Sequence, residues 1–294
     1  MTLPTVAFVG LGRMGEPMVA NLRKGGLPVR VFDASAELAR QVAARHGATA
    51  CGDWAGLARG ADIVITMLPT GAVVREVLLQ AQGGLARHLT RGTVVVDMSS
   101  SEPMGTRELG HELAALGLEL VDAPVSGGVP GAVAGTLSIM AGGSDAAIER
   151  ALPAFLTMGK RVFRTGGPGS GHATKALNNF VAASAYAATA EAVLIGQRFG
   201  LGEAQLVEVI NASTGRSFNS EIVFAGHVVP RKFATGFAMA LMAKDVAIAS
   251  ELGQAVGADA PLSRLVSQRW DDALQALGGS VDQSRALLAW GVDP

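Results

Sequence analysis

Cysteine is nearly absent from this chain of 294 residues. Cys51 is the only one, which excludes an intramolecular disulfide and a zinc site built from cysteines, and the five histidines are scattered. We therefore expect no metal. Aromatic residues are also scarce, at 5% of the chain, whereas glycine and alanine are abundant. Such a composition favours closely packed helices, some of them buried between subunits.

An excess of charge of either sign is missing too. The chain carries 24 Lys+Arg against 25 Asp+Glu, so no basic stripe indicates a nucleic-acid partner. No run of about 18 strongly apolar residues predicts a membrane span. The first residues lead directly into the apolar run 6–9, without the pattern of a signal peptide. We expect a soluble, cytoplasmic protein with no membrane partner.

Short apolar runs alternate with helical patterns through the first half of the chain. The predicted strands are residues 5–9, 29–33, 62–68, 93–97, 118–122, 137–140 and 161–164. Continuous apolar strands between helices indicate a mainly parallel sheet covered on both faces. After residue 171 we expect only helices, at 172–195, 193–199, 203–212, 238–253 and 261–277. The predicted fold is α/β: a doubly wound Rossmann domain (1–165), then an all-α domain (166–294) joined by a long helix.

That long helix follows a glycine-rich run, residues 166–171, that no helix interior would tolerate. Lys175, Asn178 and Asn179 lie three and four residues apart in its first turns, so they share a face. We interpret Lys175 as a catalytic lysine carried into a cleft beside a nucleotide-binding domain. Taken alone, Lys175 would be interpreted as a solvated helix residue. His172 is expected at the frayed start of the helix and outside the catalytic set.

Gly10, Gly12 and Gly15 follow the first strand and open a helix, with the spacing G-x-G-x-x-G. The first glycine allows a tight turn, the second lets the backbone approach a pyrophosphate, and the third allows close packing. Asp33 ends the second strand, where a carboxylate can bind the ribose hydroxyls and repel a 2′-phosphate. We therefore predict NAD, with Arg13 leaving NADP possible. The alternative is a tight turn without a ligand.

Three further loops follow strands of the predicted sheet. Ligands bind beyond the carboxyl ends of such strands, so Leu68, Pro69 and Ser100 are candidates to line the cofactor site. They could instead belong to ordinary strand–helix connections. Residues 126–128, Ser-Gly-Gly, could turn a hydroxyl and backbone N–H groups toward a small carboxylate. The alternative there is a flexible loop.

Taken together, these motifs resemble the β-hydroxyacid dehydrogenase family, which includes 3-hydroxyisobutyrate dehydrogenase and tartronate semialdehyde reductase. The matching stretches cover nearly the whole chain: 10–15 with Met18 and Asn21-Leu22, 122–137, Gly171-x-x-x-Lys175-x-x-Asn178-Asn179, and Lys244-Asp245. The segments 213–216 and 236–245 look closest to the hydroxyisobutyrate branch. Phe218 stands where that branch commonly has tryptophan, which leaves the substrate side chain open.

The resemblance implies a role for each matched position. Lys175 would be the catalytic acid/base, and Asn179 would bind the substrate or orient the lysine. The remaining substrate ligands would be Ser126, Gly127, Gly128 and Asn178. The cofactor would lie against Gly10, Leu11, Gly12, Arg13, Met14, Gly15 and Lys244. Asp33, Leu68, Pro69 and Ser100, predicted above from their places at strand ends, complete the predicted cofactor site.

We predict an NAD-dependent oxidoreductase that interconverts a short β-hydroxyacid, similar to 3-hydroxyisobutyrate, and its semialdehyde. Alternatives within the fold are a glyoxylate or succinic semialdehyde reductase and an imine reductase. An alternative of another class is a non-catalytic NAD-binding scaffold, in which the lysine is typically replaced. The alanine-rich helix from residue 172 predicts a homodimer or homotetramer that buries it.

Overall fold

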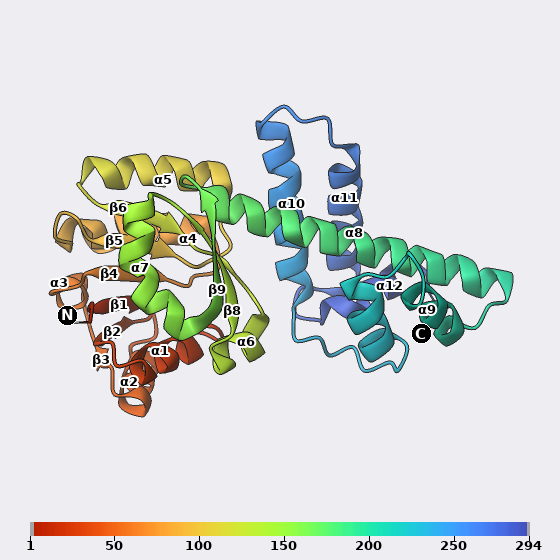
Figure 1. The fold of residues 1–294 in the computed structure, drawn as a ribbon, viewed down its shortest axis with the longest axis horizontal. Coiled ribbons are helices and arrows are strands. Elements are labelled where there is room, and N and C mark those ends of the chain that lie inside the picture. The colour runs from red at the N-terminus through yellow and green to blue at the C-terminus, as the bar shows by residue number, and fades with distance from the viewer. Residues whose placement is uncertain (1–2, 293–294) are drawn as a thin grey trace. The chain divides into compact units, whose positions relative to one another are not determined.

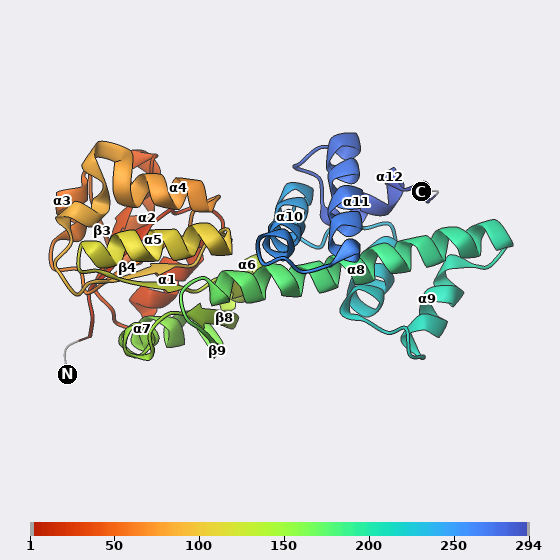
Figure 2. The same ribbon diagram turned by 90° about the horizontal axis from the view of Figure 1, so that it is seen from above.

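The protein forms two compact units in a computed structural model that describes residues 3–292. One unit extends to Lys175 and is α/β, and the other begins at Ala176. Within the described part of the second unit the elements are helical, apart from one isolated β-bridge between Ala238 and Asp282. Figures 1 and 2 trace both units in two views. The predicted fold class is confirmed.

The first unit is organised around a single nine-stranded sheet. Its strands are β1 (Val6–Val9), β2 (Val29–Phe32), β3 (Thr49–Ala50), β4 (Ile63–Thr66), β5 (Val94–Asp97), β6 (Glu119–Asp122), β7 (Val125–Ser126), β8 (Leu137–Gly142) and β9 (Gly159–Gly166). They lie in the order β3-β2-β1-β4-β5-β6-β8-β7, with β9 paired to β8. The pairs from β3 to β6 are parallel, whereas β8 runs antiparallel to β6 and β7. The strand order reverses between β1 and β4, where Rossmann folds bind dinucleotides.

Alternating side chains of the central strands enter two separate cores. Val6 and Phe8 of β1 belong to one, and Ala7 and Val9 to the other. The first core is completed by α1 (Gly15–Lys24), α2 (Ala36–His46), α6 (Gly128–Ala134) and α7 (Asp145–Met158). The second is completed by α3 (Trp54–Ala58), α4 (Gly71–Arg75), α5 (Pro103–Ala115), the π-helix η1 (Glu76–Gln80) and the 3₁₀ turns η2 (Ala81–Gly83) and η3 (Leu85–His88). Burial on both faces explains why these strands are continuously apolar.

The helix α8 (Ser170–Phe199) is 30 residues long and begins and ends beside glycines with positive φ. Gly169 has φ +85° and accepts the N–H of Ala173 on its carbonyl, and Gly200 has φ +97°. The separate helix predicted at 193–199 is therefore the end of α8. Gly196 lies inside it, and a Cβ there would come within 2.6 Å of the Leu206 side chain.

The second unit also contains α9 (Glu203–Asn211), the π-helix η4 (Asn219–Val228), α10 (Met239–Ala255), α11 (Pro261–Leu277), the 3₁₀ turn η5 (Gln283–Arg285) and α12 (Ala286–Ala289). Four of the chain's few aromatic residues meet in its core. Tyr186 lies 4.9 Å from Phe224 and 5.3 Å from Trp270, measured between ring centroids, and Trp270 lies 5.5 Å from Trp290. The Tyr186 hydroxyl donates to the carbonyl of Ser284. The sequence did not predict η4, because a π-helix departs from the 3.6-residue period.

One helix, α8, is long and apolar enough to cross a membrane by length and composition alone. Its most apolar window has a mean hydropathy of 1.2, and 44% of that window is buried inside the protein. Since core helices of soluble proteins have the same properties, this is weak evidence for a membrane span.

Candidate active site

The three glycines after β1 have three different surroundings. Gly10 has φ +96°, and a Cβ there would lie 2.3 Å from the carbonyl oxygen of Met67. A Cβ on Gly15 would lie 1.9 Å from the carbonyl oxygen of Gly10, so α1 starts directly against the end of β1. Gly12 is exposed and has nothing within 4 Å of its Cβ position. The loop therefore has a tight turn, a close helix packing and one open backbone position, as a pyrophosphate requires.

Asp33, just after β2, holds this loop in place. Its Oδ2 accepts the N–H of Leu11 at 2.8 Å, and its Oδ1 accepts that of Ser35 at 2.9 Å. Leu11 is buried, Arg13 is exposed and Met14 is half-buried. The sequence predicts Asp33 as a ribose ligand, but its hydrogen bond to the N–H of Leu11 is seen only in the structure. This hydrogen bond holds the carboxylate of Asp33 close to the glycine loop.

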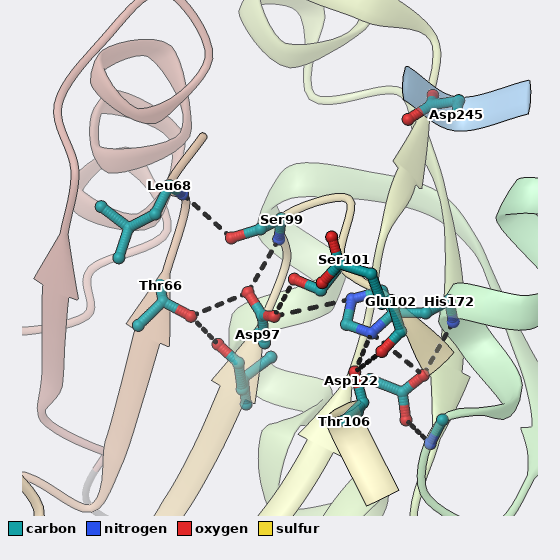
Figure 3. Close-up of polar contacts among 12 residues, drawn as sticks. Thr66, Leu68, Asp97, Ser99, Ser101, Glu102, Thr106, Asp122, His172 and Asp245 are labelled. Atoms are coloured by element: carbon teal, nitrogen blue, oxygen red, sulfur yellow. Dashed lines mark hydrogen bonds and ion pairs between the residues drawn. The ribbon is translucent and has the colours of Figure 1, made fainter. Parts of the chain in front are cut away.

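The ends of β4 and β5 are joined by a serine that the sequence did not single out. Ser99 accepts the N–H of Leu68 on its Oγ at 2.9 Å and donates its own N–H to Asp97 Oδ1 at 3.0 Å (Figure 3). Its neighbour Ser100, the predicted candidate, is half-buried, and Pro69 is exposed. Both candidates therefore lie just after the carboxyl ends of β4 and β5, on two loops that are linked by the hydrogen bond from Leu68 to Ser99.

Residues 126–128 form an ordered turn that leads into a helix. Ser126 ends β7 and is half-buried, while Gly127 has φ +127° and Gly128 has φ +58°. Gly128 opens α6, and the carbonyl of Gly127 accepts the N–H of Gly131 at 3.0 Å. Only glycine adopts these φ values freely, so the two glycines are required by the turn. The exposed N–H groups at the start of α6 suit an anion.

The polar residues of α8 divide between the two units. Lys175 is half-buried and belongs to the first unit. In the second unit the amide of Asn179 is buried and donates to Asp245 Oδ2 on α10 at 2.6 Å. Asn178 is exposed and donates to Asn179 Oδ1 at 3.1 Å, and Lys244 Nζ lies 3.8 Å from Asp245 Oδ1. Asp245 thus organises three of the predicted site residues.

The prediction for His172, at the start of α8, is wrong. His172, expected at a frayed helix end, is 1% exposed and lies between two buried carboxylates, Asp97 and Asp122. Burial raises the pKa of Asp122 above its ordinary value, against the opposing effects of His172 and of backbone N–H donors. No local pattern in the sequence indicates this cluster, because its members come from strand ends 25 residues apart and from a helix 50 residues further on.

No cluster of three or more His, Cys, Asp or Glu residues among residues 3–292 is placed to hold a metal ion. The chemically distinctive parts of the structure are the glycine loop with Asp33, the Ser-Gly-Gly turn, and the polar residues of α8. Together with the parallel sheet they define the class of protein, an oxidoreductase that binds a nicotinamide dinucleotide.

Comparison with known proteins agrees with this class. Residues 5–167 match the family described as the NAD binding domain of 6-phosphogluconate dehydrogenase, and residues 169–290 match that described as NAD-binding of NADP-dependent 3-hydroxyisobutyrate dehydrogenase. The chain is 38% identical to 2-(hydroxymethyl)glutarate dehydrogenase of Eubacterium barkeri, covering 97% of this chain and 94% of the relative. It is also 38% identical to the NAD-dependent L-serine dehydrogenase of Pseudomonas aeruginosa, covering 88% and 89%.

A solved structure of Mycobacterium tuberculosis 3-hydroxyisobutyrate dehydrogenase with L-serine superposes with a TM-score of 0.90 at 34% identity, covering 99% of this chain and all of that one. The chain belongs to the β-hydroxyacid dehydrogenase family. It is an enzyme that acts on CH–OH groups with NAD as cofactor, NADP remaining possible.

Proposed function

We propose that this enzyme interconverts a short β-hydroxyacid, with a primary alcohol on the carbon next to C2, and its semialdehyde, and that Lys175 exchanges the proton. The substrates in the names of the three relatives share the unit ⁻OOC–CHR–CH₂OH. They differ only in R, which is an amino group, a methyl group or a carboxyethyl arm. The shared unit supports the substrate class, and R stays open for this chain.

Alcohol oxidation needs a base that removes the hydroxyl proton while hydride leaves the carbon. The observation that carries the proposal is the position of Lys175, a half-buried lysine in the unit that holds the glycine loop. In the reductive direction the ammonium group would polarise the aldehyde and return the proton. A positioned acid/base of this kind typically contributes about 10²–10⁴ in rate.

NAD supplies the hydride acceptor, and the exposed backbone at Gly12 leaves room for its pyrophosphate. The residues proposed to hold it are those predicted above, from Gly10 to Gly15 with Asp33, Leu68, Pro69, Ser100 and Lys244. Asp33 would favour NAD over NADP, since a 2′-phosphate would meet a carboxylate that two backbone N–H groups already fix in place.

We assign the substrate carboxylate to the turn formed by Ser126, Gly127 and Gly128. Its hydroxyl and backbone N–H donors suit an anion. Asn179 already bonds Asp245 and Asn178, so we assign it the task of orienting Asn178, whose exposed amide would contact the substrate.

We further propose that residues 1–165 are the NAD-binding domain and 166–294 the substrate and oligomerisation domain of a cytoplasmic homodimer or homotetramer. Large apolar side chains on α8 support the oligomer: Ile195 is 69% exposed and Phe199 82% exposed. Contiguous apolar surface of this kind marks interaction sites. A monomer mass in light scattering at micromolar concentration would exclude the oligomer. Recovery of the protein in membrane pellets after cell fractionation would exclude the proposed cytoplasmic location.

The proposed function is tested by steady-state turnover of wild type and Lys175→Ala with NAD and NADP. The panel contains 3-hydroxyisobutyrate, L-serine, 2-(hydroxymethyl)glutarate, D-glycerate and 3-hydroxypropionate, with 4-hydroxybutyrate as a control whose alcohol lies one carbon further from the carboxylate. Lys175→Ala should lower kcat by about 10²–10⁴ and leave NAD binding, followed by calorimetry, unchanged. Lys160→Ala, at an exposed lysine of β9, is the matched control. Near-normal turnover by Lys175→Ala would refute the role of the lysine.

A further inference from the structure

The buried cluster at the start of α8 contains an imidazole whose two nitrogens face different partners. His172 Nδ1 lies 2.8 Å from Thr106 Oγ1, and His172 Nε2 lies 3.6 Å from Asp97 Oδ2 (Figure 3). Asp122 Oδ2 is 3.8 Å from Nδ1. The ring is buried within the first unit, between the ends of β5 and β6 and the helix α5.

The hydroxyl of Thr106 has two neighbours and one hydrogen. Its Oγ1 lies 2.9 Å from the carbonyl oxygen of Glu102, the usual acceptor for a threonine hydroxyl inside a helix. With the hydrogen on that bond, the Thr106 oxygen accepts from His172, which places a proton on Nδ1.

The second nitrogen faces a carboxylate oxygen. Asp97 Oδ2 also accepts the hydroxyl of Ser101 at 2.7 Å, while Oδ1 accepts from Thr66 Oγ1 and Ser99 N–H. An unprotonated Nε2 would turn its lone pair toward this buried anion, and Nε2 has no hydrogen bond to any described residue. A protonated Nε2 instead forms an ion pair with Asp97 and compensates one of two buried negative charges.

Asp122 fixes the backbone at the same place. Its Oδ1 accepts the N–H of Gly169 at 2.7 Å, and its Oδ2 accepts the N–H of His172 at 2.8 Å. Both are donors at the start of α8 that the helix itself leaves unbonded. There is no spare room, because a Cβ on Gly142 would lie 2.5 Å from Ser170 Oγ and 2.7 Å from Asp122 Oδ1.

We propose that His172 is an imidazolium ion in the folded enzyme, and that it is a positioning residue that locks the first turn of α8, and so Lys175, onto the ends of β5 and β6. This inference rests on the proposed function of Lys175. Three residues separate His172 from Lys175, a rise of about 4.5 Å along the helix. A displacement of His172 would therefore also displace Lys175, which lies within one turn of it. A misplacement of a catalytic group by about 1 Å can cost about 10²-fold in rate.

The charge of the ring is tested by nitrogen NMR on protein with ¹⁵N-labelled histidine. Long-range proton–nitrogen correlations distinguish imidazolium from each neutral tautomer. At about pH 8, where free imidazoles are neutral, one ring should keep both protons in wild type and in Lys175→Ala. Its signal should vanish in His172→Gln and persist in His88→Gln, an exposed control. A His172 ring that carries a proton on only one nitrogen, either Nδ1 or Nε2, would overturn the imidazolium.

The positioning role is tested by kinetics of His172→Leu and His172→Gln. We expect His172→Leu to lower kcat by about 10–10², with KM for NAD within twofold of wild type, and His172→Gln to recover part of the loss. Normal kcat in His172→Leu, together with a strongly lowered kcat in Lys175→Ala, would overturn the positioning role while the proposed function stands. Normal kcat in Lys175→Ala would overturn the proposed function, and the NMR spectrum would still decide the charge of the ring.

Discussion

Replacing Gly171 by alanine adds a single methyl group, which should disturb the packing of the start of α8 against β6 and β8. The added Cβ would lie 2.2 Å from the carbonyl oxygen of Met140, 2.6 Å from that of Asp122 and 2.9 Å from Asp122 Oδ2. Two of these atoms are backbone atoms of β8 and β6. The clash therefore cannot be relieved by rotating a side chain, and either the helix or the sheet must move.

The expected loss of stability follows from two opposing contributions. Overpacking of a filled site costs about 1–3 kcal/mol, and three contacts this short place Gly171→Ala at the upper end. Alanine in a helix recovers about 0.5–1 kcal/mol relative to glycine. The net loss is about 2 kcal/mol, and at about 2–4 °C per kcal/mol for a domain of this size Tm should fall by roughly 4–8 °C.

The assay is thermal unfolding of Gly171→Ala beside Gly167→Ala, a glycine of the same run with nothing within 4 Å of its Cβ position. Gly167→Ala should leave Tm unchanged, and kcat should fall only in Gly171→Ala, since that variant displaces the turn that carries Lys175. Equal Tm values for the two variants would refute the close packing of α8 against β6 and β8 at Gly171.

Two further predictions concern the second unit. Partial burial acts to raise the pKa of Asp282, but hydrogen bonds led by those from Ser284 hold it below its ordinary value. Its stabilising effect is therefore present above the unfolded pKa and lost as the pH falls through the folded one. Asp282→Asn should lower Tm at pH 7, and the difference from wild type should shrink below about pH 4; a constant difference in melts across this range would contradict it. Glutamate at both Ile195 and Phe199 should reduce the oligomer mass measured by light scattering, whereas Leu156→Glu on α7 should not.

The architecture of the first unit could be predicted because its signals are local. The strands β1, β2, β4, β5 and β6 are short apolar or partly apolar runs, and their alternation with helices favours a parallel sheet. The two-residue strand β3 is exposed and was not predicted. The glycine loop was predictable for the same reason, since spacing and position after a strand define it. Gly15, for example, packs against Gly10 as its place in the motif indicates.

Other features depend on contacts that no local pattern encodes. The π-helix η4 departs from the helical period, and the single helix α8 continues through Gly196, where Leu206 packs too closely for a Cβ. Ser99, rather than Ser100, binds Leu68 because of the way the ends of β4 and β5 meet. Adjacent serines have the same chemistry, so only their orientation separates them.

The sequence by itself determined the α/β class and the glycine loop, and it indicated Asp33 and Lys175 as candidate site residues. Each of these follows from residue type and spacing along a short stretch of chain. Only the tertiary structure decided that His172 is a buried partner of Asp97 and Asp122, because these residues meet when parallel strands align their carboxyl ends beneath the first turn of α8. The burial of His172 and its proximity to two carboxylates arise only from this three-dimensional arrangement, so the position of His172 in the sequence did not indicate them.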